Sequence, residues 1–267
     1  MNVLTKTFLA TVIAFAGAHA GAKTLKLTEA CDRNAERVPV GFKGHNVDQI
    51  AREVGKVMTA KDQYETSEMF TERMANSFQK LPLAISSGEL CWVDEDQIAT
   101  QYDAEAQTLW VSVMSTYKQR WFDGKSSRES LHIYVSERNR KDSTYVASNA
   151  YGATRKVSKL ERDATFLSFD PASTFGLLGS ANLPQFLGYA VPVQLTPTEA
   201  RALHEKVHVI YHFRISDPYI GAHNEIESPK LDWPFERRIK QTLVISELRG
   251  ISVINAKTGK VLHRLSF

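Results

Sequence analysis

The sequence predicts an α+β protein in which an N-terminal helical hairpin precedes a mainly antiparallel β-rich domain. Apolar residues recur at helical spacing between residues 46 and 80, and from about residue 90 they alternate with polar residues at a period of two. Gly and Asn residues separate the later segments by short connections, which favour antiparallel neighbours. We therefore expect helices over about 45–82 and strands over about 89–267.

The first twenty residues have the form of a cleavable secretory signal. Lys6 supplies the positive charge, residues 7–18 form an uncharged apolar run, and Ala18-His19-Ala20 places small residues where a signal peptidase reads them. The alternative is an apolar helix of the folded domain, which does not explain this order of features. The run falls short of the about 20 residues that a membrane-spanning helix needs. We expect cleavage after Ala20 and a single domain over 21–267.

Two cysteines, Cys31 and Cys91, follow the signal. In an oxidising compartment an even pair favours a disulfide, and the alternative is two buried thiols. Because no C-x-x-C motif occurs, a thiol-redox role is not favoured. The sequence thus predicts a disulfide in a periplasmic or secreted protein that does not span the membrane after signal cleavage.

Each predicted helix of the hairpin has a start signal. Asn46 with Gln49 three residues later has the form of a capping box, and Thr66 can cap the second helix. Pro82 ends the hairpin. The apolar positions at helical spacing are Val47, Ile50, Val54 and Val57 in the first helix and Met69, Phe70, Met74 and Phe78 in the second.

The remaining chain reads as short strands around one further helix. Thr196-Pro197-Thr198-Glu199 predicts a capped helix that ends near Lys206, because Pro takes the first helical position and Glu closes the capping box. Residues 216–236 contain three prolines and read as a loop, and Ala256-Lys257-Thr258-Gly259 as a hairpin turn. The predicted strands cover 90–93, 97–102, 108–115, 131–135, 144–149, 154–159, 165–169, 207–215, 242–247, 251–255 and 261–267.

Residues 171–198 contain no Asp, Glu, Lys or Arg. Their many Pro and Gly residues exclude a regular transmembrane helix. The favoured interpretation is a long loop with its apolar side chains buried over the core. The alternative is a loop that contacts a partner, with Phe175, Phe186 and Tyr189 as its anchors.

No pattern assigns a catalytic residue, a cofactor or a metal. His204, His208 and His212 are spaced by four, but the alternation from Val207 onward predicts a strand, on which such residues lie about 13 Å apart. No H-E-x-x-H motif accompanies them, so we expect no metal site. The G-x-S-x-G nucleophile motif and the phosphate-binding glycine motifs are absent as well.

Residues 61–73 carry a distinctive pattern, Lys61-Asp62-Gln63-Tyr64-Glu65-Thr66 followed by Phe70 and Arg73. It resembles a K-x-x-(Y/F)-E-T-x-x-x-(Y/F)-x-x-R segment of uncharacterised bacterial secreted proteins, as does Asn149-Ala150-Tyr151-Gly152-Ala153. The resemblance implies no known activity. Physically, Thr66 reads as a helix cap and Tyr64, Phe70 and Arg73 as packing and pairing positions.

The composition bears on function through charge. Loss of Lys6 with the signal lowers the formal net charge from +3 to +2, which does not indicate nucleic-acid binding. The leading hypothesis is a non-enzymatic envelope protein that binds a partner protein or another envelope component. The alternatives are a periplasmic hydrolase and a carrier of a small ligand or lipid. A cleft that gathers His208, His212 and a carboxylate would favour the hydrolase, whereas an exposed apolar patch would favour the binding protein.

Overall fold

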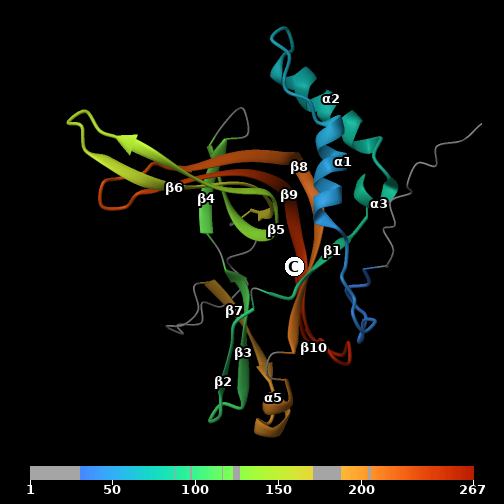
Figure 1. Cartoon of the computed structure of the whole chain (residues 1–267). Helices are drawn as coiled ribbons and strands as arrows, with labels where there is room; N and C mark the ends of the chain where they lie inside the picture. Colours follow the sequence, from blue (N-terminus) through green and yellow to red (C-terminus); the bar gives the residue numbers. More distant parts are fainter. Residues whose placement is uncertain are drawn as a thin grey trace, which may run out of the picture.

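The protein is mostly β, with strands accounting for 54% and helices for 17% (Figure 1). The computed structural model describes residues 31–86, 88–96, 98–115, 117–122, 127–170, 188–203 and 206–267. The predicted signal peptide, residues 1–20, lies outside the described residues. The helices are α1 (Val47–Val57), α2 (Ser67–Gln79), α3 (Leu83–Ser86) and α5 (Pro197–Leu203). No helix in these ranges has the length and apolar character needed to cross a membrane.

A seven-stranded mixed sheet dominates the structure, in the order β1-β8-β9-β6-β5-β4 with β10 also paired to β9. A second sheet has the order β2-β3-β7 and lies below the first in Figure 1. Pairing in the large sheet is antiparallel except between β6 and β9, which run parallel. The strands are β1 (Leu90–Asp94), β2 (Thr100–Asp103), β3 (Thr108–Ser115), β4 (Tyr117–Phe122), β5 (Ser127–Ser148), β6 (Thr154–Phe169), β7 (Gly188–Gln194), β8 (Val207–Glu227), β9 (Phe235–Asn255) and β10 (Val261–Ser266).

The predicted fold class, an N-terminal helical hairpin followed by a mainly antiparallel β-rich domain, is therefore wrong. The helix caps do form: Asn46 Oδ1 accepts the Gln49 N–H at 2.9 Å, and Thr66 Oγ1 accepts the Met69 N–H at 3.1 Å. The helices are short, however, and α1 contacts β5, β6, β8 and β9 of the large sheet. The parallel β6–β9 pair makes that sheet mixed, and local periodicity carries no information about which distant strands will pair.

The loop predicted over 216–236 is also wrong, because β8 continues to Glu227 and β9 begins at Phe235. Pro218 suggested a loop, yet it lies where the β8–β9 register shifts between Ile215 and Ile220. A bulge tolerates proline because the residue there leaves the hydrogen-bonded ladder. The strands predicted over 131–135 and 144–149 are likewise parts of one long strand, β5.

The main hydrophobic core lies between α1 and the large sheet. Ile50 and Val54 of α1 are fully buried and belong to one cluster with Leu167, Phe213 and Val244 of β6, β8 and β9. Such amphipathic burial supplies most of the stability of a short helix. The packing therefore fixes the position of α1, and with it the chain that leads into the helix.

The Lys61–Arg73 segment has a structural role. The Arg73 guanidinium donates to both carboxylate oxygens of Glu65, at 2.8 and 3.0 Å, and to Thr59 Oγ1 at 2.7 Å. The bidentate pair ties the segment before α2 to the middle of that helix, and the bond to Thr59 ties α2 to the residues that follow α1. Tyr64 differs from the prediction, because its side chain is 86% exposed and is not a packing position.

Candidate functional site

An N-terminal segment, residues 31–45, which we call the strap, is fastened to the edge of the large sheet. The predicted disulfide joins Cys31 of the strap to Cys91 of β1. At the other end of the strap the His45 N–H donates to the Cys91 carbonyl at 2.7 Å. Both ends of the strap are therefore attached to the same residue of β1.

The middle of the strap is attached to the β9–β10 turn. The Val38 N–H donates to the Gly259 carbonyl at 2.8 Å. Gly259 has φ +69°, and a Cβ there would lie 1.9 Å from the Val38 carbonyl oxygen. Gly44 has φ +67°, and a Cβ there would lie 2.7 Å from the Cys91 carbonyl oxygen. Only glycine fits such close approaches and this backbone conformation without strain.

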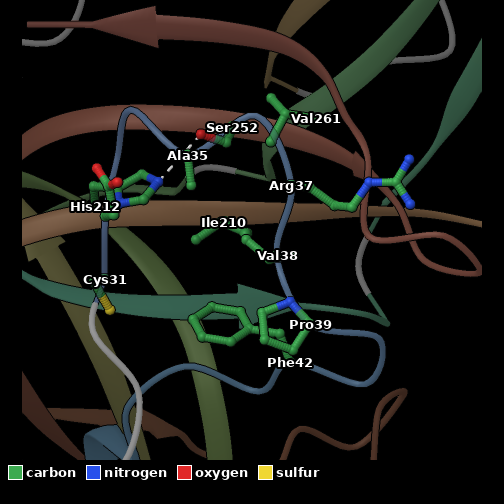
Figure 2. Close-up of a pocket in the computed structure, with 11 residues that line it drawn as sticks. Cys31, Ala35, Arg37, Val38, Pro39, Phe42, Ile210, His212, Ser252 and Val261 are labelled. Carbon is green, nitrogen blue, oxygen red and sulfur yellow. Dashed lines mark hydrogen bonds between the residues drawn. The ribbon is translucent and has the colours of Figure 1, made fainter.

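Between the strap and strands β8, β9 and β10 lies a pocket of about 220 Å³, the strap pocket (Figure 2). Most of its lining is apolar, with a few polar groups that converge on it, which is the usual composition of a small-molecule site. Its residues are Cys31, Asp32, Ala35, Arg37, Val38, Pro39 and Phe42 of the strap and Ile210, His212, Ser252 and Val261 of the strands.

His212 and Ser252 are the polar strand residues of the strap pocket. Their side chains are nearly inaccessible, at 4% and 2% exposure, and His212 Nε2 lies 3.1 Å from Ser252 Oγ (Figure 2). Among the described residues, His212 Nδ1 has no hydrogen-bond partner. Burial, together with the charges of Arg264 and Arg33, lowers the pKa of His212 to about 4, although Asp32 raises it. The imidazole is therefore neutral at pH 7.

A shallower hollow, the outer groove, adjoins the strap pocket and shares Arg37 and Val261 with it. Its lining consists of Glu36, Arg37, Lys260, Val261, Leu262, His263 and Arg264. Arg37 Nη1 donates to the Thr258 carbonyl at 3.4 Å, and Arg264 donates to the Ala35 carbonyl. Within the described ranges no carboxylate lies at ion-pair distance from either guanidinium. The outer groove thus has an excess of positive charge, with Arg37, Lys260 and Arg264 against Glu36, whereas the strap pocket itself is lined by Arg37 and Asp32.

The structure separates the histidines that the sequence grouped. His208 and His212 both lie on β8, and His208 Nδ1 is 3.6 Å from Glu95 rather than in the strap pocket. His204 lies outside the described residues. The strap pocket instead gathers His212 with Asp32 and Ser252, neither of which the sequence analysis selected. No local signal identifies them, because strand register and the path of the strap bring them together.

The proposed partner-contact residues are not tested by the described part of the structure. Phe175 and Phe186 lie outside the described residues, and so does the side chain of Tyr189, whose backbone belongs to β7. Trp233 and Tyr151 are exposed near the ends of two different hairpins. Single exposed aromatic residues are common on protein surfaces and do not define an interface.

A second buried polar cluster lies on β5 and β6. Ser168 Oγ donates to Ser130 Oγ at 2.7 Å, and Ser130 Oγ lies 2.8 Å from His132 Nε2. Burial, reinforced by His223, lowers the pKa of His132 to about 4. No sequence pattern marks these residues, because alternation alone does not distinguish a buried polar face from an exposed one.

Fold and site together define a mostly β protein with a small pocket, lined in part by Arg37, beneath a disulfide-anchored strap. No protein family matches the chain, and neither a curated protein nor a solved structure matches it.

Proposed function

We propose that the protein is exported to the cell envelope and there binds a small anionic molecule without changing it chemically. The observation that carries this proposal is a mostly apolar pocket that adjoins a groove lined by Arg37 and Arg264, neither of which has a carboxylate at ion-pair distance in the described part of the chain. The predicted signal over residues 1–20 and the Cys31–Cys91 disulfide support export, because disulfides persist in oxidising compartments.

The chemistry of the pocket suggests how such a ligand is held. The apolar part of the ligand packs against Val38, Phe42 and Ile210, all of which line the strap pocket. Its anionic group reaches Arg37, whose side chain runs out of the pocket in Figure 2 and whose planar fork suits a carboxylate. At about 220 Å³ the pocket is below the range of about 300–1,000 Å³ for drug-sized ligands. A single-ring acid fits this description better than a lipid.

Arg37→Ala is expected to weaken the binding of benzoate, used as a probe, by about tenfold or more, because a hydrogen bond to a charged group contributes about 1.5–3 kcal/mol. Isothermal titration calorimetry gives the affinity, and thermal melting gives the linked stabilisation. Benzamide tests the need for charge with the same ring. Lys257→Ala, in the exposed turn beside the outer groove, is the matched control. Native mass spectrometry of protein purified from the envelope fraction identifies any anion that copurifies.

Equal binding of benzoate and benzamide would contradict the role of charge. Equal losses in the Arg37 and Lys257 variants would contradict the assigned position of the anionic group. A protein that copurifies with no anion and binds no benzoate would rule out the proposed function.

A periplasmic hydrolase is the second candidate, because Ser252, His212 and Asp32 all line one pocket. Two observations disfavour it. Ser252 lies inside β9 and is paired with Ile210 on one side and Arg264 on the other, so its backbone is committed to the sheet rather than to an oxyanion hole. A His212 pKa of about 4 also makes the imidazole a weak general base.

Ser252→Ala distinguishes the two candidates. We expect the native protein to hydrolyse p-nitrophenyl acetate no faster than the variant does. We also expect the benzoate affinity to change by less than about tenfold, because the substitution removes one neutral hydrogen bond. A steady-state ester hydrolysis that the substitution abolishes would establish the hydrolase instead.

A further inference from the structure

We propose that Cys31, Cys91 and His45 form a zinc site when the Cys31–Cys91 disulfide is reduced. The three side chains offer their ligand atoms within 4.8 Å of one another. This is the set of two thiolates and one imidazole that zinc accepts in proteins. The inference is independent of anion binding, since it concerns the attachment of the strap and not the arginines.

The distances in the cluster are close to those of a metal site. His45 Nδ1 lies 3.2 Å from Cys31 Sγ and 3.8 Å from Cys91 Sγ. Zinc–sulfur bonds of about 2.3 Å and zinc–nitrogen bonds of about 2.0–2.1 Å place sulfur and nitrogen about 3.6 Å apart in a tetrahedral site. The imidazole therefore needs little displacement. Only the two sulfur atoms must separate, to about 3.8 Å by the same geometry.

The imidazole presents the correct atom to the metal. His45 Nδ1 lies 3.0 Å from the Cys91 amide nitrogen and 3.2 Å from the Cys91 carbonyl oxygen, so it accepts from the amide in one tautomer and donates to the carbonyl in the other. Coordination requires the tautomer with the proton on Nε2, in which Nδ1 carries a lone pair. Zinc takes this lone pair in place of the N–H. His45 and Cys91 are buried, whereas Cys31 is half-buried on the strap, so Cys31 can move as the sulfur atoms separate.

The reaction balances with a dithiol as the reductant. Two electrons and two protons from the dithiol convert the Cys31–Cys91 disulfide to two thiols, and the dithiol becomes a disulfide. Zinc binding then releases the two thiol protons as the thiolates coordinate it. The disulfide and the metal site exclude each other, because each uses both sulfur atoms.

The three-residue cluster adjoins the strap pocket through Cys31. Cys31 lines the strap pocket, as Figure 2 shows, so the cluster lies at the pocket wall. Three protein ligands with an open fourth position are typical of zinc that binds water or a substrate rather than of a closed structural site.

The test uses Co²⁺ as a spectroscopic substitute for zinc. The full mature chain is reduced anaerobically with a phosphine, freed of reductant and titrated. We expect one equivalent to bind with thiolate-to-cobalt charge-transfer absorption, and Zn²⁺ to displace it. The oxidised protein should show no such absorption. Zinc should also raise the melting temperature of the reduced protein, because the metal binds the folded state.

Two variants assign the ligands. His45→Gln should weaken Co²⁺ binding by at least about tenfold, since loss of even an outer-shell partner has an effect of that size. His208→Gln, a half-buried position on β8, is the matched control and should leave binding unchanged. If His45→Gln does not fold when oxidised, Cys31→Ser serves instead and should remove part of the charge-transfer intensity. Absence of stoichiometric binding, or equal affinity in the His45 and His208 variants, would overturn the proposal.

Discussion

Acidification from pH 7 to pH 4.5 should lower the free energy of unfolding by about 5 kcal/mol, because two buried imidazoles resist protonation in the folded protein. Burial lowers the pKa of His132 and of His212 from 6.5 to about 4. Between these pH values the unfolded chain binds protons that the folded chain excludes, so stability falls as pH falls. Each pKa shift corresponds to about 3 kcal/mol, a large fraction of the usual 5–15 kcal/mol of a domain.

Urea unfolding at pH 7, 5.5 and 4.5 measures this dependence. We expect His132→Gln and His212→Gln each to remove a large and similar part of the loss between pH 7 and 4.5, with a smaller remainder from His45 and His263, whose pKa values burial also lowers. His208→Gln, on the same strand as His212, is the matched control. The pKa values of carboxylates such as Glu236 and Glu199 are lowered, so these groups lose their stabilisation only below about pH 4.5. They therefore contribute little to the change in stability between pH 7 and 4.5. An unchanged pH slope in both histidine variants would contradict the assignment.

Local features of the fold were predictable because they depend on residues close in sequence. Thr196 and Glu199 form the predicted capping box, with the Thr196 N–H donating to Glu199 Oε2 at 2.9 Å. Gly259 closes the predicted hairpin turn with a left-handed backbone. The disulfide followed from the number of cysteines and the export signal. Each of these depends on a short-range geometric rule or on the compartment.

Strand pairing and the site were not predictable in this way. Ser158 lies beside Phe235 in a parallel pair, although β7, α5 and β8 come between them in the chain. Ser252 reaches His212 across forty positions of sequence. Shifting either strand by one residue would turn its side chains to the opposite face of the sheet. The strap adds Asp32 and Arg37 by a path that no periodicity describes.

Removal of the disulfide in a Cys31→Ala, Cys91→Ala variant should cost about 4 kcal/mol of unfolding free energy. The bond closes a loop with a sequence separation of 60 residues, and constraint of the unfolded chain accounts for a stabilisation of about that size. For a domain of 150–250 residues each kcal/mol shifts the melting temperature by about 2–4 °C. The melting temperature should therefore fall by about 8–16 °C.

The same variant shows how far the strap depends on its anchor. Hydrogen bonds from Val38 to Gly259 and from His45 to Cys91 remain after the sulfur atoms are removed. The strap should therefore stay near the sheet but open more often, and benzoate should bind more weakly because part of the free energy of binding is spent on ordering the strap. Calorimetry of the variant below its melting temperature separates this loss from unfolding. A melting temperature within about 2 °C of that of the native protein corresponds to less than one kcal/mol by the same scaling. That result would mean that the disulfide does not stabilise the protein by constraining its unfolded state. Unchanged benzoate affinity in the variant without the disulfide would place the ligand away from the strap.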